Sequence, residues 1–297
     1  MNALRAGLLG SFVPAVLLAA ALVAGQEQKE QPKEQPKGVV RLAVVITPES
    51  SGLLKQLLGD FEKQSGLKVV VDSRQDVFGL ARDGKADLVL AHYGHGGTEE
   101  FCTDGLGFWP RPVFANQAAL IGPASDPASV AGNRDAAEAF RRIARAKATF
   151  IVNNSATEKY LAEVLWQSVG RPDRTGWYLD KGLRNQAATK DAIEAAVKEK
   201  GYLLWGLVPF LKYMEENPKC GMKALVTDDP LLQRLMVTVV VKPDRVKGVN
   251  VTGAKALERF LIAPETQAKI RAFRIPGFDG QVWWPAGRNN SGAFLRG

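Results

Sequence analysis

The sequence predicts an α/β protein of two lobes, each a mixed sheet flanked by helices, with chain crossovers that form a hinge. Strand and helix patterns alternate along most of the chain, and this alternation begins a second time near residue 149. About 260 residues follow an N-terminal leader. That length suits two units of roughly 100–150 residues each.

The N-terminal segment is predicted to lie outside the folded part. Residues 1–25 place Arg5 ahead of an apolar run, a layout typical of a signal peptide, with a transmembrane anchor as the alternative. Residues 26–37 contain only Gln, Glu, Lys and Pro, so a disordered linker is expected there. The predicted location is therefore the periplasm or another extracytoplasmic compartment, reached by secretion.

The first lobe opens with a β-α-β-α-β pattern. The expected elements are strand Val39–Thr47, a helix capped by Ser50 or Ser51 and running to Gln64, strand Lys68–Asp72, helix Asp76–Asp83 and strand Asp87–His92. Near-continuous apolar strands joined by helices are typical of a parallel sheet. Because ligands of such sheets bind beyond the carboxyl ends of the strands, Thr47, Ser50, Ser51 and His92 are expected on one rim.

The remaining chain repeats the alternation. The expected elements are an extended segment Arg111–Pro123, helix Arg134–Lys147, strand Thr149–Asn154, helices Thr157–Gly170 and Ala188–Gly201, strand Tyr202–Val208, a helix from Pro209, strands Lys223–Asp228 and Leu235–Lys242, and a helical region Gly253–Phe273. Lobe 1 is predicted to comprise residues 38–123 plus 234–297, and lobe 2 residues 124–233. The cleft between them is the predicted binding site.

Composition and motifs limit the function. The formal net charge of +8 favours an anionic ligand, while scattered basic residues without interleaved aromatics do not indicate a nucleic-acid partner. The sequence lacks the G-x-S-x-G, P-loop, dinucleotide and H-E-x-x-H motifs, so no enzyme is predicted. The only histidines are His92 and His95, and neither a metal site nor a cofactor is predicted. The sequence does not decide whether the two cysteines, Cys102 and Cys220, form a disulfide.

Several stretches resemble, in order and spacing, the tungstate- and molybdate-type solute-binding proteins of ABC transporters. They are Thr47–Leu54 (TPESSGLL), residues 84–92 (GKADLVLAH), Arg111–Pro123 (RPVFANQAALIGP) and residues 135–140 (DAAEAF). The resemblance spans roughly Val39 to Phe273. It implies a type II periplasmic-binding-protein-like fold and an extracytoplasmic protein that captures a small oxyanion. The implied partner is the permease subunit of an ABC importer, and a monomer is expected.

The resemblance also implies the ligand donors. Members of this family hold a tetrahedral oxyanion with hydroxyls, helix N-termini and an arginine, which suits an anion because helix N-termini present free N–H groups. The donors implied here are Thr47, Ser50, Ser51, Ser155 and Thr157, with His92, Asn154, Arg184 and Arg234 as further candidates. The family's second-lobe arginine and acids are missing from residues 152–157 (VNNSAT). This departure leaves open an alternative function, a sensor or scaffold domain with a different ligand or a protein partner.

Overall fold

The computed structural model describes residues 38–94, 96–186 and 189–287. Its elements, in chain order, are β1 (Val39–Val44), α1 (Ile46–Ser50), α2 (Leu53–Ser65), β2 (Lys68–Ser73), α3 (Val77–Arg82), β3 (Leu88–His92), α4 (Gly96–Thr103), β4 (Arg111–Pro123), α5 (Ala136–Ala146), β5 (Phe150–Ile151), α6 (Ala156–Ser168), β6 (Tyr178–Leu179), β7 (Asn185–Gln186), β8 (Thr189–Lys190), α7 (Asp191–Glu199), β9 (Leu203–Gly206), α8 (Leu207–Glu216), β10 (Met222–Val226), the 3-10 helix η1 (Pro230–Leu232), β11 (Gln233–Val240), α9 (Val251–Ile262), α10 (Pro264–Ala272) and β12 (Trp284–Pro285).

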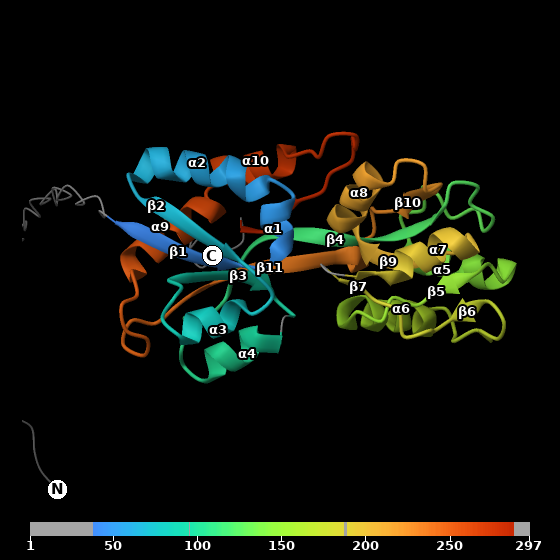
Figure 1. Cartoon of the computed structure of the whole chain (residues 1–297), viewed down its shortest axis with the longest axis horizontal. Helices are drawn as coiled ribbons and strands as arrows, with labels where there is room; N and C mark the ends of the chain where they lie inside the picture. The colour runs from blue at the N-terminus through green and yellow to red at the C-terminus, as the bar shows by residue number, and fades with distance from the viewer. Residues whose placement is uncertain (1–37, 95, 187–188, 288–297) are drawn as a thin grey trace, which may run out of the picture. The chain divides into compact units, whose positions relative to one another are not determined.

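The main sheet has the strand order β10-β4-β11-β3-β1-β2, and β9 and β12 also pair with β4. Strands β2 and β3 lie parallel to β1, as the sequence predicts, whereas β11 runs antiparallel to both β3 and β4. The long strand β4 pairs with β11 and β12 through its first half and with β9 and β10 through its second half. Strands β4 and β11 therefore form the crossover between the two lobes (Figure 1).

Apolar side chains form two buried clusters. The larger cluster joins α2, α9 and α10 to the sheet of β1, β3 and β11, and extends to side chains of α7, β9 and α8. The second cluster is centred on the fully buried Trp166 of α6. Its ring centroid lies 4.4 Å from that of Phe140 and 5.2 Å from that of Phe150. Helices α5 and α6 are thus held against β5 by aromatic packing.

Most predicted elements are confirmed within a few residues. Strand β4 has the predicted bounds, and Gly66 ends α2 in the left-handed conformation at φ 71°. The predicted end of the first strand, at Thr47, is wrong. The strand ends at Val44, and the short helix α1 follows it. Pro48 lies in the first turn of α1, where its missing N–H removes no helical hydrogen bond. The helix expected from Pro209 begins at Leu207 instead.

Two further segments differ from the sequence-based expectation. The glycine-rich stretch after His92, where no helix or strand was predicted, enters helix α4 at Gly96. The helical region predicted from Gly253 to Phe273 is two helices, because Pro264 occupies the first position of α10. The predicted signal peptide and linker lie outside the described residues, and no described helix is long and apolar enough to cross a bilayer.

The two cysteines are not bonded to each other in the structure. The Cys102 Sγ lies 3.7 Å from the carbonyl oxygen of Phe108, and burial raises the pKa of this thiol. The Cys220 Sγ lies 3.2 Å from the Met214 Sδ. The disulfide that the sequence left open is therefore absent.

A buried carboxyl group on α9 makes stability depend on pH. The Thr238 hydroxyl donates to Glu258 Oε2 at 2.8 Å, and burial raises the pKa of Glu258. The folded state therefore holds this proton more tightly than the unfolded state does. Below the pKa of the unfolded state the carboxyl group is protonated in both states, and its contribution to the free energy of unfolding is fully present. That contribution is lost as pH rises through the higher pKa of the folded state.

Replacing Glu258 with glutamine is expected to increase the free energy of unfolding at pH 7, because the amide keeps an acceptor for Thr238 without a buried charge. The gain should shrink towards pH 4, where Glu258 itself becomes protonated. Urea unfolding at both pH values measures the difference. A Glu258→Gln variant that is less stable than the parent at pH 7 would show that the ion pair with Arg111, at 3.4 Å, outweighs the desolvation.

Candidate functional site

The first group of predicted donors lies at the corner between α1 and α2. The Ser50 hydroxyl donates to the carbonyl oxygen of Thr47 at 3.3 Å. The Ser51 hydroxyl donates to the carbonyl oxygen of Pro48 at 3.1 Å, and its oxygen accepts the N–H of Leu53 at 3.2 Å. Ser51 therefore satisfies the first N–H group of α2, but the N-cap residue is Gly52 in the left-handed conformation, without a side-chain cap, so the predicted serine cap is wrong. Ser50 is exposed to solvent.

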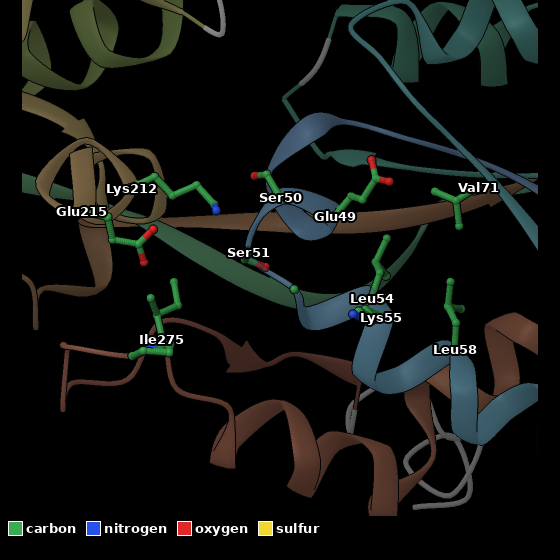
Figure 2. Close-up of a pocket in the computed structure, with 12 residues that line it drawn as sticks. Glu49, Ser50, Ser51, Leu54, Lys55, Leu58, Val71, Lys212, Glu215 and Ile275 are labelled. Carbon is green, nitrogen blue, oxygen red and sulfur yellow. The ribbon is translucent and has the colours of Figure 1, made fainter.

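A cavity of about 580 Å³ opens beside this corner. Ser50 and Ser51 line it together with Lys212 and Glu215 of α8 (Figure 2). The Lys212 amino group points towards Ser50 in this view. The predicted rim at Ser50 and Ser51 therefore shares a cavity with helix α8, which the sequence analysis did not connect with it.

The second group of predicted donors lies at the start of α6. Ser155 is the N-cap residue, but its side chain does not cap the helix. Its hydroxyl instead donates to the carbonyl oxygen of Asn185 at 2.9 Å. The side-chain oxygen of Asn153 accepts the N–H groups of Ser155 and Asn185, both at 3.1 Å. We call Asn153, Ser155 and Asn185 the asparagine junction.

The asparagine junction connects two helix N-termini. Asn185 Oδ1 accepts the N–H of Ile193 in the first turn of α7, at 3.0 Å. The positive ends of the α6 and α7 dipoles therefore meet near the same residues. The Asn185 Nδ2 is buried and has no hydrogen-bond partner in the part of the chain that the structure describes. Such an unpaired buried donor costs about 1–3 kcal/mol, so this amide is a candidate ligand contact.

Sequence reasoning missed Asn153 and Asn185 as site residues. They lie 32 positions apart in the sequence and meet through a hydrogen bond. A single asparagine in a loop carries no spacing signal. The only hint was the position of Asn153, near the end of a predicted strand and shortly before a predicted helix.

Arg234 links the crossover to α6. Its Nη1 lies 3.2 Å from Glu158 Oε1, and its Nη2 donates to the Thr157 hydroxyl at 3.1 Å. The side chains of Arg234 and Glu158 are 21% and 8% exposed, so the pair is largely removed from water. Arg234 also pairs in register with Asn116 of β4, whose side-chain oxygen lies 3.3 Å from His92 Nε2. His92 therefore lies on the same stretch of sheet as the arginine.

The remaining predicted donors are placed less centrally. Asn154 is engaged within its own lobe, because its amide donates to Asp180 at 2.8 Å and accepts from Lys159 at 2.7 Å. Arg184 is exposed, and its carbonyl oxygen accepts the Thr189 hydroxyl at 3.1 Å. No group of three His, Cys, Asp or Glu side chains within the described ranges is arranged to hold a metal ion, and His95 lies outside those ranges.

The predicted residues therefore fall into two groups. Ser50 and Ser51 line the cavity beside α8. Thr157, Asn154 and Arg234 surround the start of α6 with Ser155. No hydrogen bond recorded between described residues joins the first group to the second.

Comparison with known sequences identifies similar proteins. The profile of the PBP superfamily domain matches residues 30–265. The tungstate-binding protein TupA of Peptoclostridium acidaminophilum is 28% identical over 288 residues, which cover 93% of this chain and 97% of that protein. A putative ABC transporter anion-binding protein of Haloferax volcanii is 28% identical over 249 residues, which cover 82% of this chain and 71% of that protein.

Comparison with solved structures identifies proteins of the same fold. The tungstate-binding protein TupA from Desulfovibrio alaskensis superposes with a TM-score of 0.71 at 24% identity, covering 84% of this chain and 99% of that chain. A tungstate ABC transporter structure from Geobacter sulfurreducens gives a TM-score of 0.64 at 25% identity, covering 79% and 98%. The predicted fold class is confirmed. These relatives are named as binding or transporter proteins, which supports the prediction that the chain is not an enzyme.

Proposed function

The chain belongs to the PBP superfamily, and we propose that it is an extracytoplasmic solute-binding protein that captures a small oxyanion for an ABC importer. Tungstate and molybdate are the leading ligands, because relatives that cover most of the chain are named for tungstate or anion binding. The proposed lobes are residues 38–123 plus 234–297 and residues 124–233, with the oxyanion between them. The protein would reach its compartment through a signal peptide and meet the permease as a monomer.

The observation that carries this proposal is the set of donors at the start of α6. The unpaired Asn185 amide, the Ser155 hydroxyl and two helix N-termini all favour negative charge. Arg234 supplies a cation beside them and takes the place of the arginine that the VNNSAT segment lacks. Closure of the lobes would add Thr47, Ser50 and Ser51 from the opposite side.

Tungstate or molybdate is expected to raise the unfolding temperature of the mature chain, and sulfate and phosphate to raise it less. A ligand at about 100 times its Kd adds about 2.7 kcal/mol to a folded state that alone binds it. Thermal unfolding with each anion at matched ionic strength measures this effect. The absence of a shift with every oxyanion would contradict the proposal and favour the sensor or scaffold alternative.

Ser51→Ala and Ser155→Ala are each expected to weaken tungstate binding about tenfold, since a hydrogen bond to a charged ligand contributes about 1.5–3 kcal/mol. Ser155→Ala should also cost about 1 kcal/mol of stability, because its bond to Asn185 is lost. Ser168→Ala is the matched control, a serine that bonds a backbone carbonyl at the far end of the same helix. Titration calorimetry gives the affinities, and unchanged affinity in both variants would exclude this site.

A further inference from the structure

The loop between α4 and β4 carries the most exposed large apolar side chain among the described residues. Trp109 is 81% exposed, while the preceding Phe108 is half-buried. The Phe108 N–H donates to the carbonyl oxygen of Val240 at 2.8 Å. The Lys242 N–H donates to the carbonyl oxygen of Leu106, also at 2.8 Å. These bonds fix the loop to the end of β11, with the indole of Trp109 in solvent.

Three basic side chains lie beside this loop. The ammonium nitrogens of Lys242 and Lys255 lie 5.8 and 4.5 Å from the centroid of the Phe108 ring. The Arg245 guanidinium lies next to the start of the loop. A cation–π contact orients an ammonium group without neutralising it, since the ring has no net charge. We call Trp109, Lys242, Arg245 and Lys255 the Trp109 surface.

The acidic side chains that border the Trp109 surface leave it with an excess of positive charge. Asp104 pairs with Arg82 at 2.8 Å. The buried Glu258 pairs with Arg111 at 3.4 Å. Asp244 is exposed in the turn that follows β11. Asp244 thus offsets only part of the charge of the three basic side chains, and the surface attracts anionic partners.

The Trp109 surface lies at the end of the main sheet that is remote from the proposed oxyanion site. Val240, the last residue of β11, pairs with Leu88, the first residue of β3. The rim with Ser50 lies beyond the opposite, carboxyl end of the parallel strands β1 and β3. A partner that covers the Trp109 surface therefore leaves that rim accessible.

We propose that the Trp109 surface docks on an anionic phospholipid membrane. The indole enters the boundary between headgroups and acyl chains, the region of a bilayer in which tryptophan is enriched. Lys242, Arg245 and Lys255 approach the headgroup phosphates, where each basic side chain adds to the attraction. A single projecting indole ringed by flexible cations suits a fluid, uniform surface better than a shaped protein pocket. The proposed function also places the chain beside a membrane-embedded permease.

Vesicles of stated composition test the docking. We expect the mature chain to co-sediment with vesicles of phosphatidylcholine and phosphatidylglycerol in equal parts, and at least about tenfold more weakly with phosphatidylcholine alone. High salt should release it, because exposed charges are screened. Phosphatidylcholine brominated on its acyl chains, in the same anionic mixture, should quench the fluorescence of Trp109. Trp166, Trp177, Trp205 and Trp283 are buried, so they should respond little.

Two variants test the two components of the Trp109 surface. Lys242→Gln/Lys255→Gln should weaken vesicle binding about thirtyfold, since each lysine contributes about tenfold at most. Trp109→Ala should weaken binding at least about tenfold and abolish the quenching by brominated lipid. The matched controls are Lys198→Gln/Lys223→Gln, which removes two exposed lysines of α7 and β10, and Tyr160→Ala, which removes a 73% exposed aromatic ring of α6.

Both controls should bind vesicles as the parent does. Equal binding by all variants, or no binding to the anionic vesicles, would overturn the proposal. Binding without quenching of Trp109 would also overturn it and would favour an acidic protein as the partner of this surface. The tungstate response is independent, because the Trp109 surface contains none of the proposed oxyanion donors. The Trp109 and lysine variants should therefore keep the thermal shift with tungstate, whatever the vesicles show.

Discussion

Replacing Asp87 with alanine is expected to lower the free energy of unfolding by about 3–5 kcal/mol. The Asp87 side chain is buried directly before β3 and accepts the Arg41 backbone N–H at 2.7 Å. It also forms an ion pair with the Arg41 guanidinium at 2.5 Å and accepts the N–H of Asn250, the N-cap residue of α9, at 2.9 Å. One carboxylate therefore holds β1, β3 and α9 together.

The Asp87→Ala variant would leave two backbone N–H groups without their acceptor. It would also remove the counter-ion of the Arg41 guanidinium, which would keep only the carbonyl oxygens of Gly84 and Gly248. Asp83→Ala is the matched control, because Asp83 forms only an exposed pair with Lys85, and its loss should change stability by less than about 0.5 kcal/mol. Urea unfolding measures both values. A loss below 1 kcal/mol for Asp87→Ala would mean that water replaces the carboxylate without difficulty, contrary to the burial of this corner.

The sequence predicts much of the fold because its strongest signals are local. The apolar run of β4 and the left-handed glycine after α2 need no tertiary context. Helix α4 could not be found in this way, since its Gly96–Gly97 start reads as a loop. The structure supplies the reason: a Cβ atom at Gly97 would lie 2.6 Å from the Phe78 ring, so close packing of α3 requires glycine there.

The residues of the candidate site also differ in whether local sequence signals could predict their position. The position of Ser50 and Ser51 at the edge of the sheet was predictable, because the carboxyl ends of parallel strands define a rim. Lys212 lies far along the chain on a helix whose position depends on the crossover strands, and no sequence spacing connects it to that rim. The asparagine junction was hidden for a similar reason, because its residues meet through hydrogen bonds between separate loops.

Replacing Arg234 with methionine is expected to lower the free energy of unfolding by about 2–3 kcal/mol and to weaken tungstate binding by more than about tenfold. The loss of stability follows from Glu158, whose buried carboxylate would lose its cation. The loss of affinity follows from the proposed role of Arg234 as the positive charge beside the α6 donors. Thermal unfolding and titration calorimetry with tungstate measure the two effects separately.

The double variant Arg234→Met/Glu158→Gln separates a structural from a ligand-binding role for Arg234. Removing both charges should restore most of the stability, because no buried carboxylate is left unpaired. Tungstate affinity should remain low, since the cation that faces the anion is still absent. The Glu158→Gln single variant should bind tungstate at least as tightly as the parent, because Arg234 then has no competing carboxylate. If the double variant instead recovers full affinity, Arg234 only positions α6, and the oxyanion is held by the helix N-termini and the asparagine junction without a counter-ion.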